Sequence, residues 1–137
     1  MGASVSVGEY VSITLADGGT HSGLNFSANP DGTPYDDNDQ TQTNPAMKVI
    51  VGSETNVNVD IGIKGSTSSA LALDSWKYCD TYLGIKAGLT TSYVAVYTNA
   101  TPGTFNFYHW VTVPAATPSG SYSATVYYKA VKTATGF

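Results

Sequence analysis

The chain has 137 residues, of which 42% are hydrophobic and only 12% are charged, and its formal net charge is −4. This length predicts a single domain that buries a core of its own. Its basic residues are six lysines, with no arginine. That composition argues against a nucleic-acid partner, because phosphate and base recognition depend on clustered basic side chains. No run of about 18 apolar residues occurs, so we expect no membrane-spanning helix.

The N-terminal half alternates between short strand-like segments and polar breaks. Period-two alternation of apolar and polar residues is the signature of a half-buried strand. The break at 17–23 contains three glycines, and residues 29–45 form a polar loop that contains three of the six prolines. Strands are expected over residues 3–15, 24–27, 47–51 and 57–64.

The C-terminal half continues the same pattern and ends in two aromatic segments. A connector that contains Pro and Ser, residues 115–119, separates these two segments. Strands are expected over residues 71–78, 82–85, 92–97, 104–113 and 122–131. Eight or nine short strands at near-regular spacing, with no helical period, predict an all-β fold. We expect a single antiparallel β-sandwich of the immunoglobulin-like or Greek-key type.

The composition also bears on where the protein acts. Thr, Ser, Asn and Tyr are abundant and charges are few, which suits an exported β protein. From Met1 the sequence leads directly into a strand pattern, so we expect a signal peptide to be absent from this chain. Cys79 is the only cysteine, which excludes an internal disulfide. We expect its thiol to be a small buried hydrophobic group.

Four segments carry a resemblance to a known group of proteins. They are Glu9-Tyr-Val-Ser-Ile13, Thr55-Asn-Val-Asn-Val-Asp60 with Lys64-Gly65, Phe107-Tyr-His-Trp110 with Val113-Pro-Ala115, and Tyr127-Tyr-Lys-Ala-Val131. With them the chain resembles archaeal secreted surface β-sandwich proteins. Some of these resemble subunits of extracellular threads or pili that polymerise by donor-strand complementation, in which one subunit's terminal strand completes its neighbour's sheet. The resemblance covers most of the chain and implies an extracellular, cell-surface location.

The first strand is the main functional candidate. Residues 1–16 would form this strand and residues 17–137 the sandwich domain, with a Gly-rich hinge between them. The strand can pair within its own sandwich, or it can enter the next copy, where main-chain hydrogen bonds supply affinity. A head-to-tail contact that does not close produces a filament. In that case the groove of the neighbour would be filled by Val5, Val7, Val11, Ile13 and Leu15.

Aromatic residues on the last two strands are the second candidate. Along 105–113 alternate residues face the core, and we expect the opposite face to be wet or interfacial. The candidate contacts are Tyr108, Trp110 and, on the last strand, Tyr127. Such rings can stack on sugars or contact another subunit, whereas cross-strand pairing that only stabilises the sheet is the alternative. The alternative function is therefore an extracellular carbohydrate- or surface-binding module, and a third is a coat module without a ligand.

The remaining polar residues suggest modification and metal binding, and no enzyme. Asn25 and Asn99 begin N-glycosylation sequons, so covalent glycans are expected partners if the protein is exported. The loop carboxylates can offer oxygens to calcium, but their spacing matches no EF-hand, and such residues also favour turns. These carboxylates are Asp31, Asp36, Asp37 and Asp39. No other cofactor is expected.

The two histidines do not indicate catalysis. His21 and His109 lie far apart in the sequence, and no nucleophile motif accompanies them. Together with one cysteine they also make a poor zinc site, which needs three or four ligands. We expect His109, on an apolar alternation, to be a hydrogen-bonded core residue.

Overall fold

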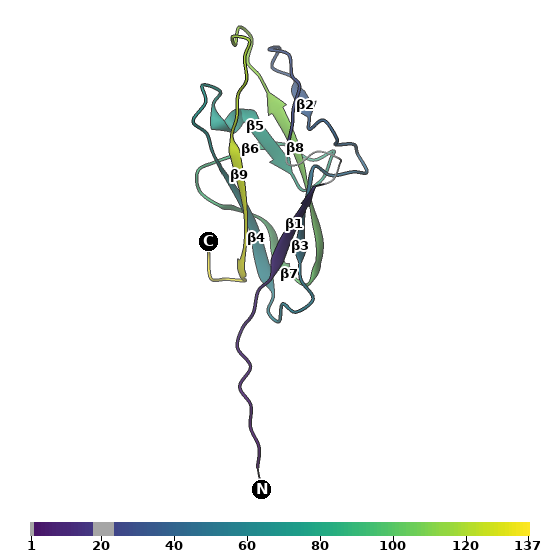
Figure 1. Ribbon diagram of the computed structural model, residues 1–137, viewed down its shortest axis with the longest axis vertical. Coiled ribbons are helices and arrows are strands. Elements are labelled where there is room, and N and C mark those ends of the chain that lie inside the picture. The colour runs from purple at the N-terminus through teal and green to yellow at the C-terminus, as the bar shows by residue number, and fades with distance from the viewer. Residues whose placement is uncertain (1, 18–23) are drawn as a thin grey trace.

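The computed structural model describes residues 2–17 and 24–137, and within them the protein is all-β (Figure 1). The all-β prediction is confirmed. The nine strands of these residues compare with the eight or nine expected. The elements are β1 (Ile13–Asp17), β2 (Pro34–Asp36), β3 (Met47–Val51), β4 (Val59–Ser66), the 3-10 turn η1 (Leu73–Ser75), β5 (Trp76–Cys79), β6 (Ala87–Gly88), β7 (Val94–Ala100), β8 (Gly103–Thr112) and β9 (Thr125–Lys132).

The strands form two antiparallel sheets. The larger has the order β1-β3-β8-β5-β6, with β2 also pairing with β8, and the smaller has the order β7-β4-β9. In register, Ile13 lies opposite Val51, Met47 opposite Phe107, and Val59 opposite Lys132. The two aromatic segments of the C-terminal half, β8 and β9, therefore belong to different sheets. Their connector carries the chain from one sheet to the other and does not close a hairpin.

The two sheets share one apolar core. Val49 on β3, Ile61 on β4 and Phe107 on β8 have no exposed surface. The ring of Phe107 contacts Tyr97 of β7 and Tyr128 of β9 edge-on, with centroids 5.6 and 5.0 Å apart. Such geometry suits the quadrupoles of aromatic rings, so these contacts stabilise the pairing of the two sheets.

Several expected strands differ from those observed. Residues 24–27 are not a strand, and residues 82–85 are a loop in which Leu83 and Ile85 are 81% and 95% exposed. Residues 71–78 contain only η1 and the start of β5, and the expected polar loop contains β2. These segments are short, so tertiary contacts decide their conformation more than their own pattern does.

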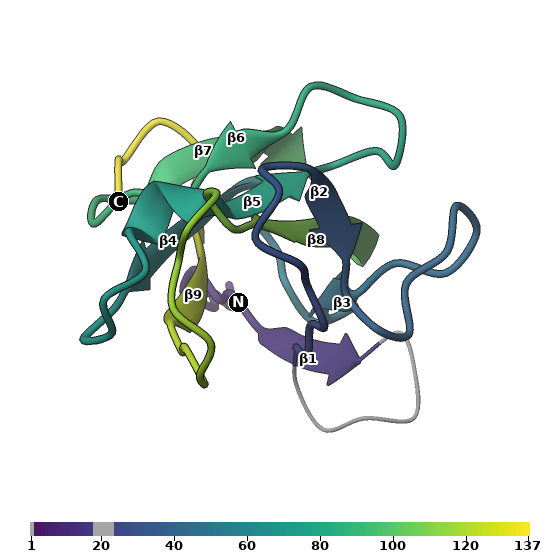
Figure 2. The ribbon, with the colours of Figure 1, turned by 90° about the horizontal axis from the view of Figure 1, so that it is seen from above.

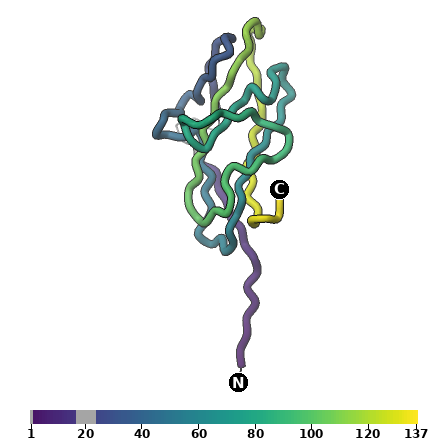
Figure 3. Tube along the Cα trace, turned by 180° about the vertical axis from the view of Figure 1, so that it is seen from behind, coloured from purple at the N-terminus to yellow at the C-terminus, as the bar shows by residue number. Residues whose placement is uncertain are grey.

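The most consequential difference concerns the first segment. Only residues 13–17 of the expected strand pair with the domain, antiparallel to β3. Ile13 packs against the domain's own core, whereas Leu15, which lies opposite Val49, is 52% exposed. That these two side chains fill a neighbour's groove stays a prediction. The preceding residues project from one end of the molecule along its long axis (Figure 1, Figure 3).

Candidate functional site

Residues 2–7, which we call the arm, lie outside the domain. Val5 and Val7 are 87% and 79% exposed. No hydrogen bond from the described part of the domain reaches the arm, and a Cβ added at Gly2 or Gly8 would have no atom within 4 Å. In an extended chain alternate side chains share a face, so Val5 and Val7 lie on one side and Ser4 and Ser6 on the other. The arm thus presents an apolar edge and unused backbone groups to solvent.

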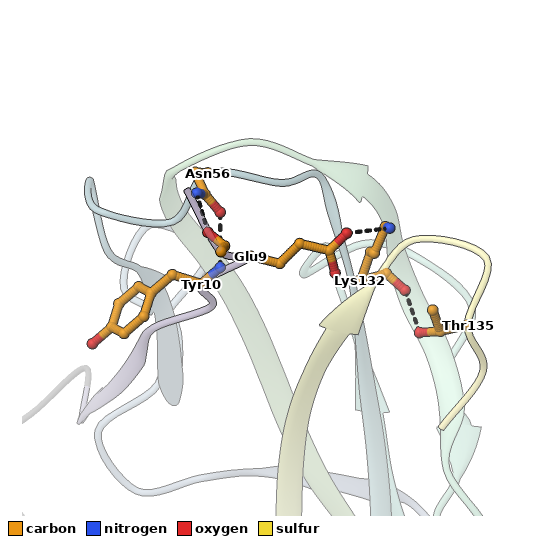
Figure 4. Close-up of polar contacts among 6 residues, drawn as sticks. Glu9, Tyr10, Asn56, Lys132 and Thr135 are labelled. Atoms are coloured by element: carbon orange, nitrogen blue, oxygen red, sulfur yellow. Dashed lines mark hydrogen bonds and ion pairs between the residues drawn. The ribbon is translucent and has the colours of Figure 1, made fainter. Parts of the chain in front are cut away.

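The root of the arm, by contrast, is fixed to the domain by Asn56 (Figure 4). The side-chain Oδ1 of Asn56 accepts a hydrogen bond from the Tyr10 N–H at 2.8 Å, and its Nδ2 donates to the Gly8 carbonyl at 2.9 Å. The Asn56 N–H also donates to the Tyr10 carbonyl at 3.2 Å. We call these three hydrogen bonds the Asn56 clamp. They hold the backbone of residues 8–10 and so set the direction in which the arm leaves.

Two further contacts support the clamp. The Ser12 N–H donates to Thr55 Oγ1 at 3.0 Å, and the Glu9 carboxylate contacts Lys132 Nζ at 2.5 Å (Figure 4). Because both charged side chains are about half exposed, this ion pair contributes little stability. The ion pair does, however, show where the root of the arm lies, because Lys132 is the last residue of β9. The arm therefore leaves the domain at the end where β9 terminates and β1 begins.

A groove lies beside the beginning of β9, at the other end of that strand. It consists of two adjoining hollows of about 290 and 230 Å³ that share Phe26, Trp76 and Tyr122. Along the β9 side Tyr122, Ala124 and Val126 are half-buried and alternate with exposed residues. We call this the β9 groove. The residues that line it, from Leu24 to Ala28 on one wall and Gly120 to Val126 on the other, carry no charge.

Trp76, in the lining of the β9 groove, carries an unpaired hydrogen-bond donor. The Trp76 ring packs edge-on against Phe26, with centroids 5.7 Å apart. Its indole Nε1–H is buried and finds no acceptor in the described part of the chain. A buried donor without a partner costs about 1–3 kcal/mol. Nε1 itself is buried, so it is not part of the surface that the groove presents to a ligand. Sequence reasoning missed Trp76, because no local pattern marks it.

The expected wet aromatic face is not present on β8. Tyr108 and Trp110 are only 7% and 2% exposed, because Tyr82 stacks on both, with centroid distances of 5.8 and 5.9 Å. Lys86 Nζ lies 4.4 Å from the centroid of the Trp110 ring. β8 is a central strand and is covered on both faces, so the prediction that these rings form an exposed surface is wrong. Tyr127 is 42% exposed, but it belongs to the other sheet.

The loop carboxylates do not come together as a metal site. Among the described residues there is no group of three or more His, Cys, Asp and Glu side chains that could hold a metal ion. Asp31 accepts hydrogen bonds from Thr33 and Tyr35, which lower the pKa of its carboxyl group, and Asp36 accepts one from Tyr82. Asp37 accepts the Asn25 and Asp39 N–H groups, so these side chains stabilise turns.

His109 is a core residue, as expected. It is 2% exposed, and its Nε2 lies 2.6 Å from the Tyr128 hydroxyl across the two sheets. Burial lowers the pKa of His109 to about 4, against the opposing effect of a hydrogen bond to the Lys77 backbone. Cys79 is buried with a free thiol, as predicted. The other histidine, His21, lies outside the described residues.

Both sequon asparagines are exposed. Asn99 lies near the end of β7 in a left-handed conformation (φ 54°), with its side-chain Oδ1 accepting a hydrogen bond from Asn58 at 2.8 Å. Asn25 also lines the β9 groove.

Comparisons with protein-family models, curated proteins and solved structures return no significant match. Among the described residues no helix is long and apolar enough to cross a membrane. Function must therefore be argued from the arm and the β9 groove.

Proposed function

We propose that the chain is a structural subunit of an extracellular cell-surface filament, which polymerises head to tail by exchange of its N-terminal strand. One observation carries this proposal: the arm holds two apolar side chains that are 87% and 79% exposed, on a backbone without partners in the described domain. An extended segment of this kind is the form in which a strand adds to the sheet of another molecule. Because each copy has one arm, the contacts can repeat head to tail, and a repeat that does not close produces a filament.

The donated segment is shorter than the sequence predicted. Residues 8–12 are held by the Asn56 clamp and Thr55, and residues 13–17 pair with β3. This leaves Val5 and Val7 as the side chains that enter a neighbour, while the 36% exposed Val11 lies at the root. The two sheets with a shared core support an immunoglobulin-like sandwich as the body of the subunit. Exposure of Asn25 and Asn99 is compatible with N-linked glycans on the surface.

The alternative, a carbohydrate-binding module, loses its main support. Tyr108 and Trp110 are buried beneath Tyr82 and cannot present a ring face to a sugar. Tyr127 remains exposed without either of them beside it in its sheet.

Electron microscopy of the purified full chain tests the proposal. We expect unbranched filaments from the full chain and folded monomers from a variant that lacks residues 2–7, since the arm contacts nothing in its own domain. The control is Leu83→Ser with Ile85→Ser, which replaces two exposed apolar side chains outside the arm. This variant should still form filaments. Filaments from the truncated chain would disprove the proposal.

A further inference from the structure

We infer that the β9 groove of one copy receives the arm of the next, with Val5 and Val7 inside. This inference rests on the filament function proposed above and specifies its acceptor. The occupant is a second copy of this chain, and the direction, length, charge and hydrogen-bonding of the two surfaces support it.

The direction of the strands favours this pairing. β9 ends at Lys132, beside the root of the arm, so the β9 groove at Tyr122–Val126 lies toward the opposite end of the domain. Seen from above, the N-terminus lies in projection between β9 and β1 (Figure 2). A copy shifted along the long axis therefore brings its arm to the β9 side of its neighbour. In that arrangement the arm runs antiparallel to β9, which is the pairing that β9 already makes with β4.

Length and charge also match. Six extended residues span about 20 Å, and residues 122–126 span about 16 Å, so the arm reaches along the wall of the β9 groove. Neither the arm nor the lining of the groove carries a charged side chain. Insertion therefore requires no desolvation of an ionised side chain, which would otherwise oppose it.

The main chain beside the β9 groove has a free edge at which a further strand could pair. β9 has a strand neighbour, β4, on one side only within the described chain. Residues 121–124, which precede β9, belong to no strand. The Ser123 carbonyl accepts hydrogen bonds from the Thr67 and Ser69 hydroxyls, which fixes this segment from the β4 side. An incoming arm would use the opposite side and lengthen β9 at its beginning.

Disulfide trapping in the full chain tests the acceptor. In a Cys79→Ser background, Val7→Cys with Ala124→Cys should give a ladder of covalent oligomers under mild oxidation. The control, Val7→Cys with Val94→Cys, places the second thiol on β7, the other edge of the same sheet, and should give no ladder. If filaments form but only the control pair gives a ladder, the β9 groove is not the acceptor, whereas the proposed filament function is still supported. An absence of filaments in the unmodified chain would overturn both.

Discussion

Replacing both arm valines by serine should prevent assembly without affecting the fold. In the monomer, Val5 and Val7 already lie in solvent, so Val5→Ser with Val7→Ser removes no packing from the domain. In the filament the same side chains would lie in the β9 groove, and serine would place two hydroxyls there. The variant separates the energy of assembly from the energy of folding.

The size of the effect follows from the exposure of the two side chains. Burying one valine is worth about 1.5–3 kcal/mol, and most of this gain must come from assembly, since 87% and 79% of these side chains are now exposed. In an open groove the lower half of that range applies, which gives about 3–4 kcal/mol for the pair. At 1.4 kcal/mol for each factor of ten, the critical concentration rises about 100- to 1,000-fold.

Sedimentation of the assembled fraction over a range of protein concentrations measures this change directly. Thermal unfolding of the monomer is measured in parallel and should be the same as for the unaltered chain. Leu83→Ser with Ile85→Ser is the matched control, because these side chains are as exposed as the arm valines but belong to the loop between β5 and β6. The reasoning is refuted if the arm variant assembles at the original concentration, or if the loop variant is equally impaired.

Three further predictions concern the clamp, the core histidine and a close backbone contact. Asn56→Ala removes the two side-chain hydrogen bonds of the clamp, so filaments should still form but bend more, seen as a shorter persistence length in electron micrographs; equally straight filaments would exclude a directing role. His109 has a pKa depressed to about 4, so the unfolded chain binds its proton first, near the ordinary value of 6.5. The free energy of unfolding should therefore be highest above pH 6.5 and fall by up to about 3 kcal/mol as the pH drops to about 4, which urea unfolding would measure. An equal fall in His109→Gln would show that another group causes the pH dependence. Gly88→Ala should destabilise the domain by about 1–3 kcal/mol, because its Cβ would lie 2.8 Å from the Asp74 carbonyl oxygen, whereas Gly8→Ala, with open space around it, should leave the melting temperature unchanged.

Strands with strong alternation were predictable from the sequence. β3 and β4 lie close to the expected ranges 47–51 and 57–64, and the core residues Val59, Ile61 and Ile63 are those of the predicted apolar face. A face that is buried against another sheet imposes this period on the sequence, so the pattern can be read without knowing the partner.

The arm shows where such reading stops. Residues 3–15 alternate with Glu9 as the one exception, yet only residues 13–17 pair with β3. Alternation indicates that a strand is covered on one face. The sequence pattern is identical whether the covering sheet belongs to the same copy or to the next one. The burial of Trp110 was missed for a related reason, because Tyr82 and its loop, which cover the outer face of β8, lie some 28 positions away in the printed sequence.

The β9 groove could not be predicted, since its parts are remote in the sequence. Phe26, Trp76 and Tyr122 meet only because β5 and β9 lie in different sheets and the connector before β9 crosses between them. The one local signal was the alternation of Tyr122, Ala124 and Val126.

Cryo-electron microscopy of the full chain under conditions of assembly tests the central claim most directly. We expect a filament with one domain in each repeat, in which density for residues 2–7 lies along the beginning of β9 of the neighbouring copy and runs antiparallel to it. Monodisperse monomers at every protein concentration, or filaments in which the arm remains in solvent, would contradict the account.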